Sequence, residues 1–227
     1  MARATTAVEG WEDGSDDEDT LTGDLGATLR TRPSIVTSNG ETWMWRVRYK
    51  KFRGRGPGAL ERPTGADGIF QIEVTRGDEK HFKGLLFQAK KAGTTDGRLA
   101  AQVERMEGLA SGGSAIFEYG PNAYRAATGH AYLTAGSPSL RSKGAPLQSL
   151  SSFLGDSFLP CGTGLRGMYY DALRALLLLP TGPAIRIPIR HRIVVEAELR
   201  NDQAVAVRSN NRSQRPSPRV ARQRRST

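Results

Sequence analysis

The sequence predicts an α/β protein in which a central mixed sheet is flanked by helices. Apolar residues first recur with helical spacing, then three strand-like segments follow, and a second helical segment precedes another strand. Apolar positions three or four residues apart are typical of helices, whereas alternating or short continuous apolar runs are typical of strands. We place this helix–strand–strand–strand–helix–strand core at residues 18–120, with a C-terminal α/β extension over residues 121–200 packed on it.

Charge is unevenly distributed along the 227 residues, whose formal net charge is +10. Residues 1–19 hold seven acidic residues against Arg3, whereas residues 201–227 hold seven arginines against Asp202. We expect a mobile acidic leader over residues 1–17 and a disordered basic tail over residues 201–227. The basic middle favours a polyanionic partner, although excess lysine and arginine also keep proteins soluble.

Cysteine and histidine usage excludes several classes of protein. The single cysteine, Cys161, leaves no intrachain disulfide and no cysteine-rich zinc site, and the three histidines lack metal-ligand spacing. The N-terminus is acidic and lacks a signal-peptide pattern, and the apolar runs are too short to span a bilayer. We therefore expect a soluble cytoplasmic protein.

The first predicted helix covers residues 18–31. Leu21, Leu25 and Leu29 recur every four residues and form one apolar face. Acidic residues cluster at its start, where the helix dipole favours negative charge, and Arg32-Pro33 ends it.

The next segment, residues 42–52, alternates as a strand with one aromatic face and one basic face. A loop rich in glycine follows at residues 54–58. A solvated strand face would explain the basic residues, but their interleaving with aromatic side chains favours contact with phosphates. The residues expected to contact nucleic acid are Arg46, Arg48, Lys50, Lys51, Arg53 and Arg55.

Two apolar runs, residues 69–74 and 83–90, are joined by a charged turn and predict an antiparallel hairpin. The second run has little polar alternation, which predicts a central strand covered on both faces. Beyond it, the pattern predicts a helix over 97–110 and a strand over 114–119. Residues 120–160 have few periodic segments and must include some loop. A buried helix is predicted over 165–179, and one or two strands over 185–199, with Pro188 at an edge or a bend.

The hairpin places Asp67 at the head of one strand and Gln88 and Lys90 near the end of the other. Phosphodiester hydrolysis requires an in-line water, neutralised phosphate charge and help for the leaving oxygen, which Mg²⁺ bound by oxygen ligands can supply. Asp67 is the natural anchor ligand, and the Gln88 side chain and the Ala89 carbonyl offer neutral oxygens. Lys90 points the same way as Gln88, where it can orient or deprotonate the attacking water. The alternative without a catalytic role is that Asp67 starts a turn, Gln88 is a polar strand residue and Lys90 lies at a solvated strand end.

The element order, with Asp on the second strand and Gln-x-Lys on the third, resembles the PD-(D/E)XK restriction-endonuclease-like superfamily and, within it, the Mrr-type nucleases. The resemblance covers roughly residues 18–120, through Glu18 in EDTLTGDLGATL, Asp67 in GADG, and Gln88 and Lys90 in FQAKK. It implies catalytic roles for these four residues and Mg²⁺ or Mn²⁺ held by Asp67, Gln88, the Ala89 carbonyl and Glu18, with Gln102 as a supporting polar group.

The sequence departs from the family pattern at two positions. Ala66 stands where a proline precedes the aspartate, and the neutral Gln88 replaces an acid, which should weaken metal binding. Glu41 and Glu61 compete with Glu18 for its role, and Glu73 could also face the site. We prefer Glu18 because it alone lies on the predicted first helix.

The resemblance implies a Mg²⁺-dependent DNA endonuclease of bacterial or phage restriction or defence. It would work as a homodimer or beside a separate recognition or modification subunit, and the choice between DNA and RNA stays open. The alternatives are a catalytically inactive nucleic-acid-binding module of the same fold and a basic protein-interaction factor. Cys161 is expected to be a small buried residue, and Tyr169 and Tyr170 are expected in the core or on a helix surface.

Overall fold

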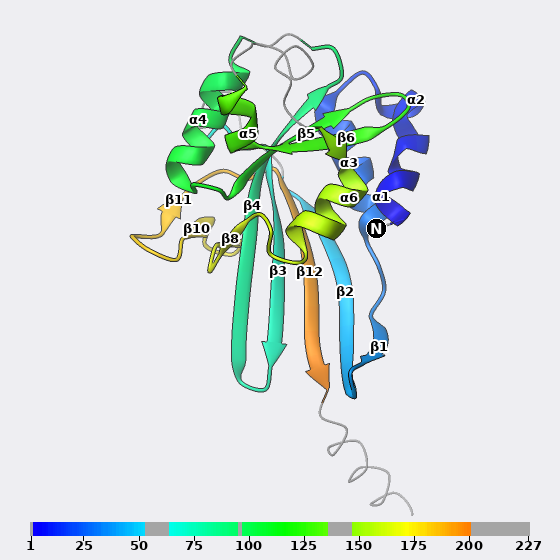
Figure 1. Cartoon of the computed structure of the whole chain (residues 1–227), viewed down its shortest axis with the longest axis vertical. Helices are drawn as coiled ribbons and strands as arrows, with labels where there is room; N and C mark the ends of the chain where they lie inside the picture. Colours follow the sequence, from blue (N-terminus) through cyan, green and yellow to red (C-terminus); the bar gives the residue numbers. More distant parts are fainter. Residues whose placement is uncertain (1, 53–63, 95–96, 136–146, 201–227) are drawn as a thin grey trace, which may run out of the picture.

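The computed structural model describes residues 2–52, 64–94, 97–135 and 147–200. Its main sheet has the strand order β1-β2-β12-β3-β4-β5-β6-β7, with β8 beside β4 (Figure 1). The sheet is mixed, because β3 and β4 pair antiparallel whereas β4 and β5, which the helix α4 (Leu99–Leu109) connects, pair parallel. Its strands are β1 (Ser34–Ser38), β2 (Glu41–Lys51), β3 (Gly68–Arg76), β4 (Glu79–Lys91), β5 (Ser114–Tyr119), β6 (Tyr124–Thr128), β7 (Gln148–Ser149), β8 (Leu165–Arg166) and β12 (His191–Arg200).

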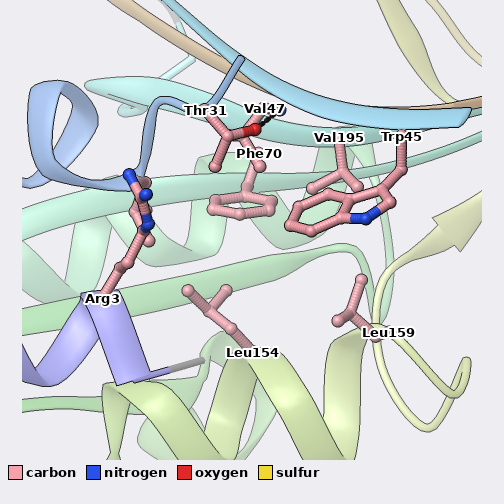
Figure 2. A pocket seen from close by; sticks show the side chains of 9 residues that line it. Arg3, Thr31, Trp45, Val47, Phe70, Leu154, Leu159 and Val195 are labelled. Carbon is pink, nitrogen blue, oxygen red and sulfur yellow. Dashed lines mark hydrogen bonds between the residues drawn. The ribbon is translucent and has the colours of Figure 1, made fainter. Parts of the chain in front are cut away.

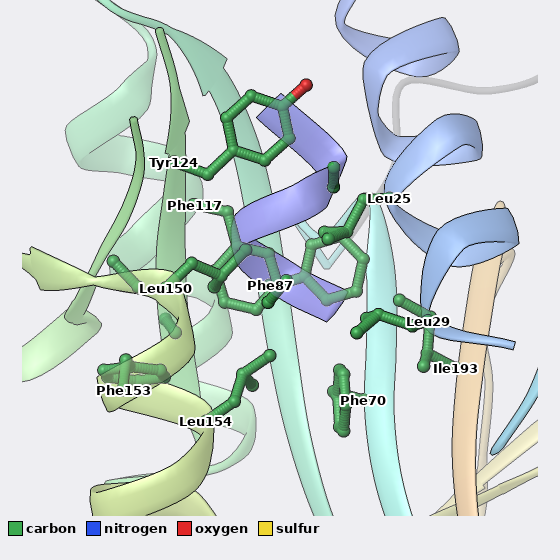
Figure 3. Close-up of a cluster of buried hydrophobic side chains, with 14 of the residues drawn as sticks. Leu25, Leu29, Phe70, Phe87, Phe117, Tyr124, Leu150, Phe153, Leu154 and Ile193 are labelled. Carbon is green, nitrogen blue, oxygen red and sulfur yellow. The ribbon is translucent and has the colours of Figure 1, made fainter. Parts of the chain in front are cut away.

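Helices cover both faces of this sheet. On one face α3 packs its leucines against Phe70 and Phe87, with Phe153 completing the same buried cluster (Figure 3). On the other face, Val103 and Met106 of α4 belong to a second buried cluster. The helical segments are α1 (Ala2–Thr6), η1 (Ala7–Gly10), α2 (Trp11–Gly14), α3 (Glu18–Leu29), α4 (Leu99–Leu109), α5 (Gly129–Thr134), α6 (Leu150–Ser152) and the π-helical turn η2 (Phe153–Phe158). The expected α/β class with a central mixed sheet between helices is confirmed.

The helix α3 forms as its leucine spacing predicts. Leu21, Leu25 and Leu29 are buried, and the side chain of Asp17 caps the helix by accepting a hydrogen bond from the Asp19 amide. Gly26 has a packing reason, because a Cβ there would overlap the Tyr49 ring. The glycine therefore lets α3 lie directly on β2.

The last strand, β12, lies inside the main sheet. It pairs antiparallel with β2 and parallel with β3, so it separates two strands that precede it in the chain. Part of the segment expected to pack on the core as an extension thus supplies a central strand of the sheet. The short edge strand β11 (Ile185–Arg186) lies just before Pro188, in agreement with the predicted edge or bend there.

The predicted helix over residues 165–179 is wrong. That segment forms β8, β9 (Tyr169–Asp171) and β10 (Leu176–Leu178), and a second sheet has the order β11-β10-β9. Gly167 has a φ of 81° and Ala175 a φ of 55°, and neither value fits an α-helix. A continuous leucine run fits a buried strand as well as a helix, so its periodicity could not decide between them.

The acidic leader is also ordered, contrary to the expectation for residues 1–17. Residues 2–14 form α1, η1 and α2, and α1 contacts both α3 and α6. Ala4 and Ala7 are buried in the same core as α3, and the Arg3 side chain donates to the backbone oxygen of Arg30 at 2.8 Å. Small alanine side chains allow this close packing while the acids face outward. The basic tail, residues 201–227, lies outside the described residues.

A pocket of about 240 Å³ lies on the sheet face beside α1 and η2 (Figure 2). Its polar lining consists of Arg3 and Thr31, whose hydroxyl accepts a hydrogen bond from the Val47 amide at 2.8 Å. The other lining residues are Leu29, Trp45, Val47, Phe70, Leu154, Leu159 and Val195. No residue of the predicted site lines this apolar pocket.

Candidate functional site

Asp67 and Gln88 lie opposite each other where β3 begins and β4 approaches its end. Gly68 pairs with Phe87, and the Asp67 amide donates to the Phe87 carbonyl at 2.8 Å, so the ladder continues one residue beyond β3. One Asp67 carboxylate oxygen, Oδ2, accepts hydrogen bonds from the Gln88 side-chain amide and, at 2.9 Å, from the Ala89 backbone amide. The antiparallel register therefore brings the predicted acid and the predicted Gln-x-Lys segment together.

Lys90 and Glu18 meet at the same end of β4. The Lys90 ammonium lies 3.5 Å from Glu18 Oε2, and the other Glu18 oxygen accepts from the Lys91 backbone amide at 3.0 Å. Lys90 is 7% exposed, so its charge lies in a largely water-excluded position beside the Glu18 carboxylate. We call Glu18, Asp67, Gln88 and Lys90 the strand-end cluster. The helix α3 thus places Glu18 at the end of β4.

The donor atoms of the strand-end cluster suit a hard divalent cation. Gln88 Nε2 donates to Asp67 Oδ2 and also lies 3.2 Å from the Ala89 carbonyl oxygen, so the amide nitrogen sits between two of the predicted ligand oxygens. Rotating this amide by half a turn would point Gln88 Oε1 toward the same two oxygens, which would then require a cation between them. Carboxylate, amide and backbone oxygens are the ligands that Mg²⁺ takes. Asp67, Gln88 and the Ala89 carbonyl therefore fit Mg²⁺, with a single carboxylate among the three. Glu18, the fourth predicted ligand, contacts Lys90 and the Lys91 amide instead.

Two other observations bear on this fit. The Gln102 side-chain oxygen is buried and has no hydrogen-bond partner within the part of the chain that the structure describes. Gln102 lies against the loop that carries Asp67, since a Cβ at Gly65 would overlap the Gln102 backbone oxygen. Gly65 also has a φ of 70°, which favours glycine there. Among residues 2–52, 64–94, 97–135 and 147–200, no three His, Cys, Asp or Glu side chains group closely enough to hold a metal. Neutral oxygens would thus make up most of the ligands.

The competing acids have partners elsewhere. Glu41, at the start of β2, receives two hydrogen bonds of 3.0 Å from Arg76. Glu73 pairs with Arg192 at 2.7 Å and accepts from Gln71. Glu61 lies outside the described residues. Of the described candidates, Glu18 is the one that reaches the end of β4.

The basic face of β2 is largely engaged within the protein. Arg46 and Arg48 both pair with Glu196 of β12, and Lys50 lies over the Phe52 ring at 5.0 Å. Lys51 points to the opposite face and pairs with Asp19 at 2.6 Å. The side chains of Arg46 and Arg48 remain 40% and 49% exposed, so both can still reach solvent. Arg53 and Arg55 fall outside the described residues.

A second polar network, which sequence reasoning missed, adjoins the strand-end cluster. The ring of His191 lies 2.7 Å from Asp19 and 2.9 Å from the Tyr49 hydroxyl, and Lys51 completes the set. We call Asp19, Tyr49, Lys51 and His191 the His191 network. These residues come from α3, β2 and β12, and their spacing in the sequence carries no signal that would group them.

Cys161 is exposed, so the expectation of a small buried cysteine is wrong. The Lys83 ammonium lies 3.4 Å from its sulfur. The slight burial of the Cys161 thiol acts to raise its pKa, but Lys83 and Arg166 outweigh this effect and lower the pKa. Tyr170 is buried and Tyr169 stacks on Phe82 with ring centroids 4.2 Å apart, so both tyrosines serve in packing.

Comparison with protein-family models, with curated proteins and with solved structures gives no match for this chain. Within the described residues, none of the helices combines the length and the hydropathy needed to cross a membrane.

Proposed function

We propose that this chain is a Mg²⁺-dependent endonuclease that hydrolyses phosphodiester bonds in DNA. The observation that carries the proposal is the convergence of Asp67, Gln88, Lys90 and Glu18 at one end of the β3–β4 hairpin. The element order α3-β1-β2-β3-β4-α4-β5 contains the predicted helix–strand–strand–strand–helix–strand order with one additional strand, β1. This order supports a restriction-endonuclease-like core of the Mrr type in which β12 lies between β2 and β3. A role in bacterial or phage restriction or defence, in the cytoplasm, accords with this class.

The chain's own residues divide the chemistry between them. Asp67, Gln88 after its amide turns, and the Ala89 carbonyl would hold the ion, and Glu18 would pair with Lys90 beside them. When bound, Mg²⁺ supplies charge neutralisation at the phosphate and polarises the attacking water. The Lys90 ammonium orients that water by donating a hydrogen bond to it, and its charge stabilises the negative charge that develops on the phosphate. Glu18 holds the Lys90 ammonium in place.

The basic groups of β2 are the proposed nucleic-acid contacts. Exposed fractions of 40% and 49% leave Arg46 and Arg48 able to exchange Glu196 for a phosphate. A homodimer or a separate recognition subunit would supply the sequence specificity that the strand-end cluster itself does not provide.

Conversion of supercoiled plasmid to nicked and linear forms tests the proposed function. We expect cleavage with Mg²⁺ or Mn²⁺ and none with EDTA. Lys90→Ala should slow cleavage by about 100-fold or more, because it removes the group that orients the water and stabilises the developing charge. The exposed Lys80, at the far end of the β3–β4 hairpin, provides the matched control in Lys80→Ala. Equal cleavage by Lys90→Ala and wild type would refute the assigned site.

One observation favours a second candidate function, a catalytically inactive nucleic-acid-binding module. Gln88 is neutral, and its amide nitrogen occupies the position between Asp67 and the Ala89 carbonyl. Salt-dependent DNA or RNA binding without hydrolysis under any divalent metal would support this candidate and exclude the nuclease.

A further inference from the structure

The buried side chain of His191 connects the first turn of α3 to the strand β2. Its Nε2 lies 2.7 Å from Asp19 Oδ1, and its Nδ1 lies 2.9 Å from the Tyr49 hydroxyl. Because Asp19 is a carboxylate, we assign the ring proton to Nε2, which leaves Nδ1 to accept from Tyr49. The ring is 1% exposed, so both contacts are shielded from water.

The backbone of the same residue holds Asp67. The amides of Arg190 and His191 donate to the Asp67 carbonyl oxygen at 3.1 Å and 3.2 Å. Asp67 in turn binds Gln88 and Ala89 through its side chain. His191 therefore contacts both the loop that carries the predicted metal ligand and the helix that carries Glu18.

Asp19 is the neighbour of Glu18 on the first turn of α3. Beyond His191, Asp19 pairs with Lys51 at 2.6 Å and lies 3.9 Å from Arg190. Charge-assisted hydrogen bonds are about twice as strong as neutral ones, so these contacts fix the rotation of the first helical turn. Glu18 then reaches the Lys91 amide and the Lys90 ammonium.

We infer that Asp19 and His191 are positioning residues that set the Glu18 carboxylate against Lys90 at the end of β4. The catalytic value of this placement rests on the proposed function, but the placement itself does not. Neither residue touches the reacting atoms, and both act through Glu18 and the Asp67 backbone. Residues of this kind change metal-dependent activity by about 10–100-fold in other proteins.

The backbone amide of Lys91 reports the placement directly, because it donates to Glu18 Oε1 at 3.0 Å. In a proton–nitrogen correlation spectrum, Glu18→Ala gives the shift of the unbound Lys91 amide. We expect Asp19→Ala and His191→Ala to move the Lys91 resonance toward that position. His191→Gln keeps a donor near the position of Nε2, so it should return the resonance toward its wild-type position.

The variant Tyr119→Phe provides the control. It removes the 3.1 Å bond between the Tyr119 hydroxyl and Thr22, which also holds α3 but does not involve Asp19. The inference is overturned if the Lys91 resonance stays in place in Asp19→Ala, or if Tyr119→Phe moves it equally.

Cleavage assays on the same variants separate this inference from the proposed function. If the wild-type chain cleaves no nucleic acid but the Lys91 amide moves as expected in the variants, the positioning role stands and the nuclease is refuted. If the wild-type chain cleaves nucleic acid but the Lys91 amide does not move in Asp19→Ala, only the positioning role is refuted. If both hold, cleavage by Asp19→Ala should be slower by about 10–100-fold.

Discussion

The strand-end cluster and the His191 network meet at Asp67, whose side chain bonds Gln88 and whose carbonyl accepts from the His191 amide, but they are built differently. The strand-end cluster depends on strand register, because Asp67 and Gln88 face each other on the two strands of a hairpin that has a two-residue turn. The His191 network joins α3, β2 and β12, which are far apart in the chain. Local strand pairing thus brings Asp67 and Gln88 together, whereas long-range packing sets the position of the helix that supplies Glu18.

No change in stability is expected to be larger than that of Gly26→Ala, which displaces the Tyr49 ring of the His191 network. A Cβ at residue 26 would overlap the Tyr49 ring, which packs on His191. Overpacking of this kind costs about 1–3 kcal/mol of unfolding free energy. Urea denaturation measures it, with Gly97→Ala as a control because a Cβ at residue 97 has open space around it. Equal stability of the two variants would contradict the close packing of α3 on β2.

The variant Gln88→Glu changes the strand-end cluster instead. A carboxylate there would face Asp67 Oδ2 and the Ala89 carbonyl without the amide hydrogens that now satisfy them. Without metal we expect the unfolding free energy to fall by about 1–3 kcal/mol, and excess Mg²⁺ should restore it.

Thermal unfolding with EDTA and with Mg²⁺ measures this difference. Gln71→Glu is the matched control, because Gln71 is also buried on β3 but bonds Glu73 and the Tyr170 amide. If Mg²⁺ restores the stability of Gln71→Glu, or fails to restore that of Gln88→Glu, the strand-end cluster does not hold the ion.

Acid should weaken the fold through the His191 network. Burial outweighs the attraction of Asp19 and lowers the pKa of His191 below its ordinary 6.5, so the unfolded chain binds the proton more readily. The resulting stability is complete above about pH 6.5 and is lost as the pH falls through the lowered value. Burial acts to raise the pKa of Asp19, but Lys51 and His191 outweigh it and lower that pKa, so further acid acts in the same direction.

Melting temperatures measured between neutral and mildly acidic pH test this dependence. The melting temperature of wild type should fall as the pH drops below about 6.5, and that of His191→Gln should fall less over the same range. An identical pH dependence in both proteins would mean that His191 does not carry the effect.

The smallest effect is expected from Glu41→Gln, which touches neither group of residues. The Arg76–Glu41 pair has side chains that are 55% and 40% exposed. Exposed ion pairs contribute less than about 1 kcal/mol, so urea denaturation should find little change and cleavage should be unaffected. A large loss of cleavage would bring Glu41 back as a candidate for the role given to Glu18.

Sequence reasoning reached the elements whose signals are local. The leucine spacing of α3 and the apolar runs of β3 and β4 predicted those elements, and the register then followed. The insertion of β12 between β2 and β3 has no local signal, since strand order is set by packing across the whole chain. For the same reason His191 could not be placed beside Asp19. The leucine run of β10 fits a strand and a helix equally well. The buried alanines Ala4 and Ala7 lie in an acidic segment without an apolar repeat, so no pattern predicted their burial.

Titration calorimetry of Mg²⁺ into wild type and into Asp67→Asn measures most directly whether the strand-end cluster holds a metal. Asparagine keeps the shape of Asp67 but removes the single carboxylate among the three proposed ligands. We expect wild type to bind one Mg²⁺ per chain and Asp67→Asn to bind none over the same concentration range. Equal binding by the two proteins would contradict the metal site and, with it, the proposed metal-dependent hydrolysis.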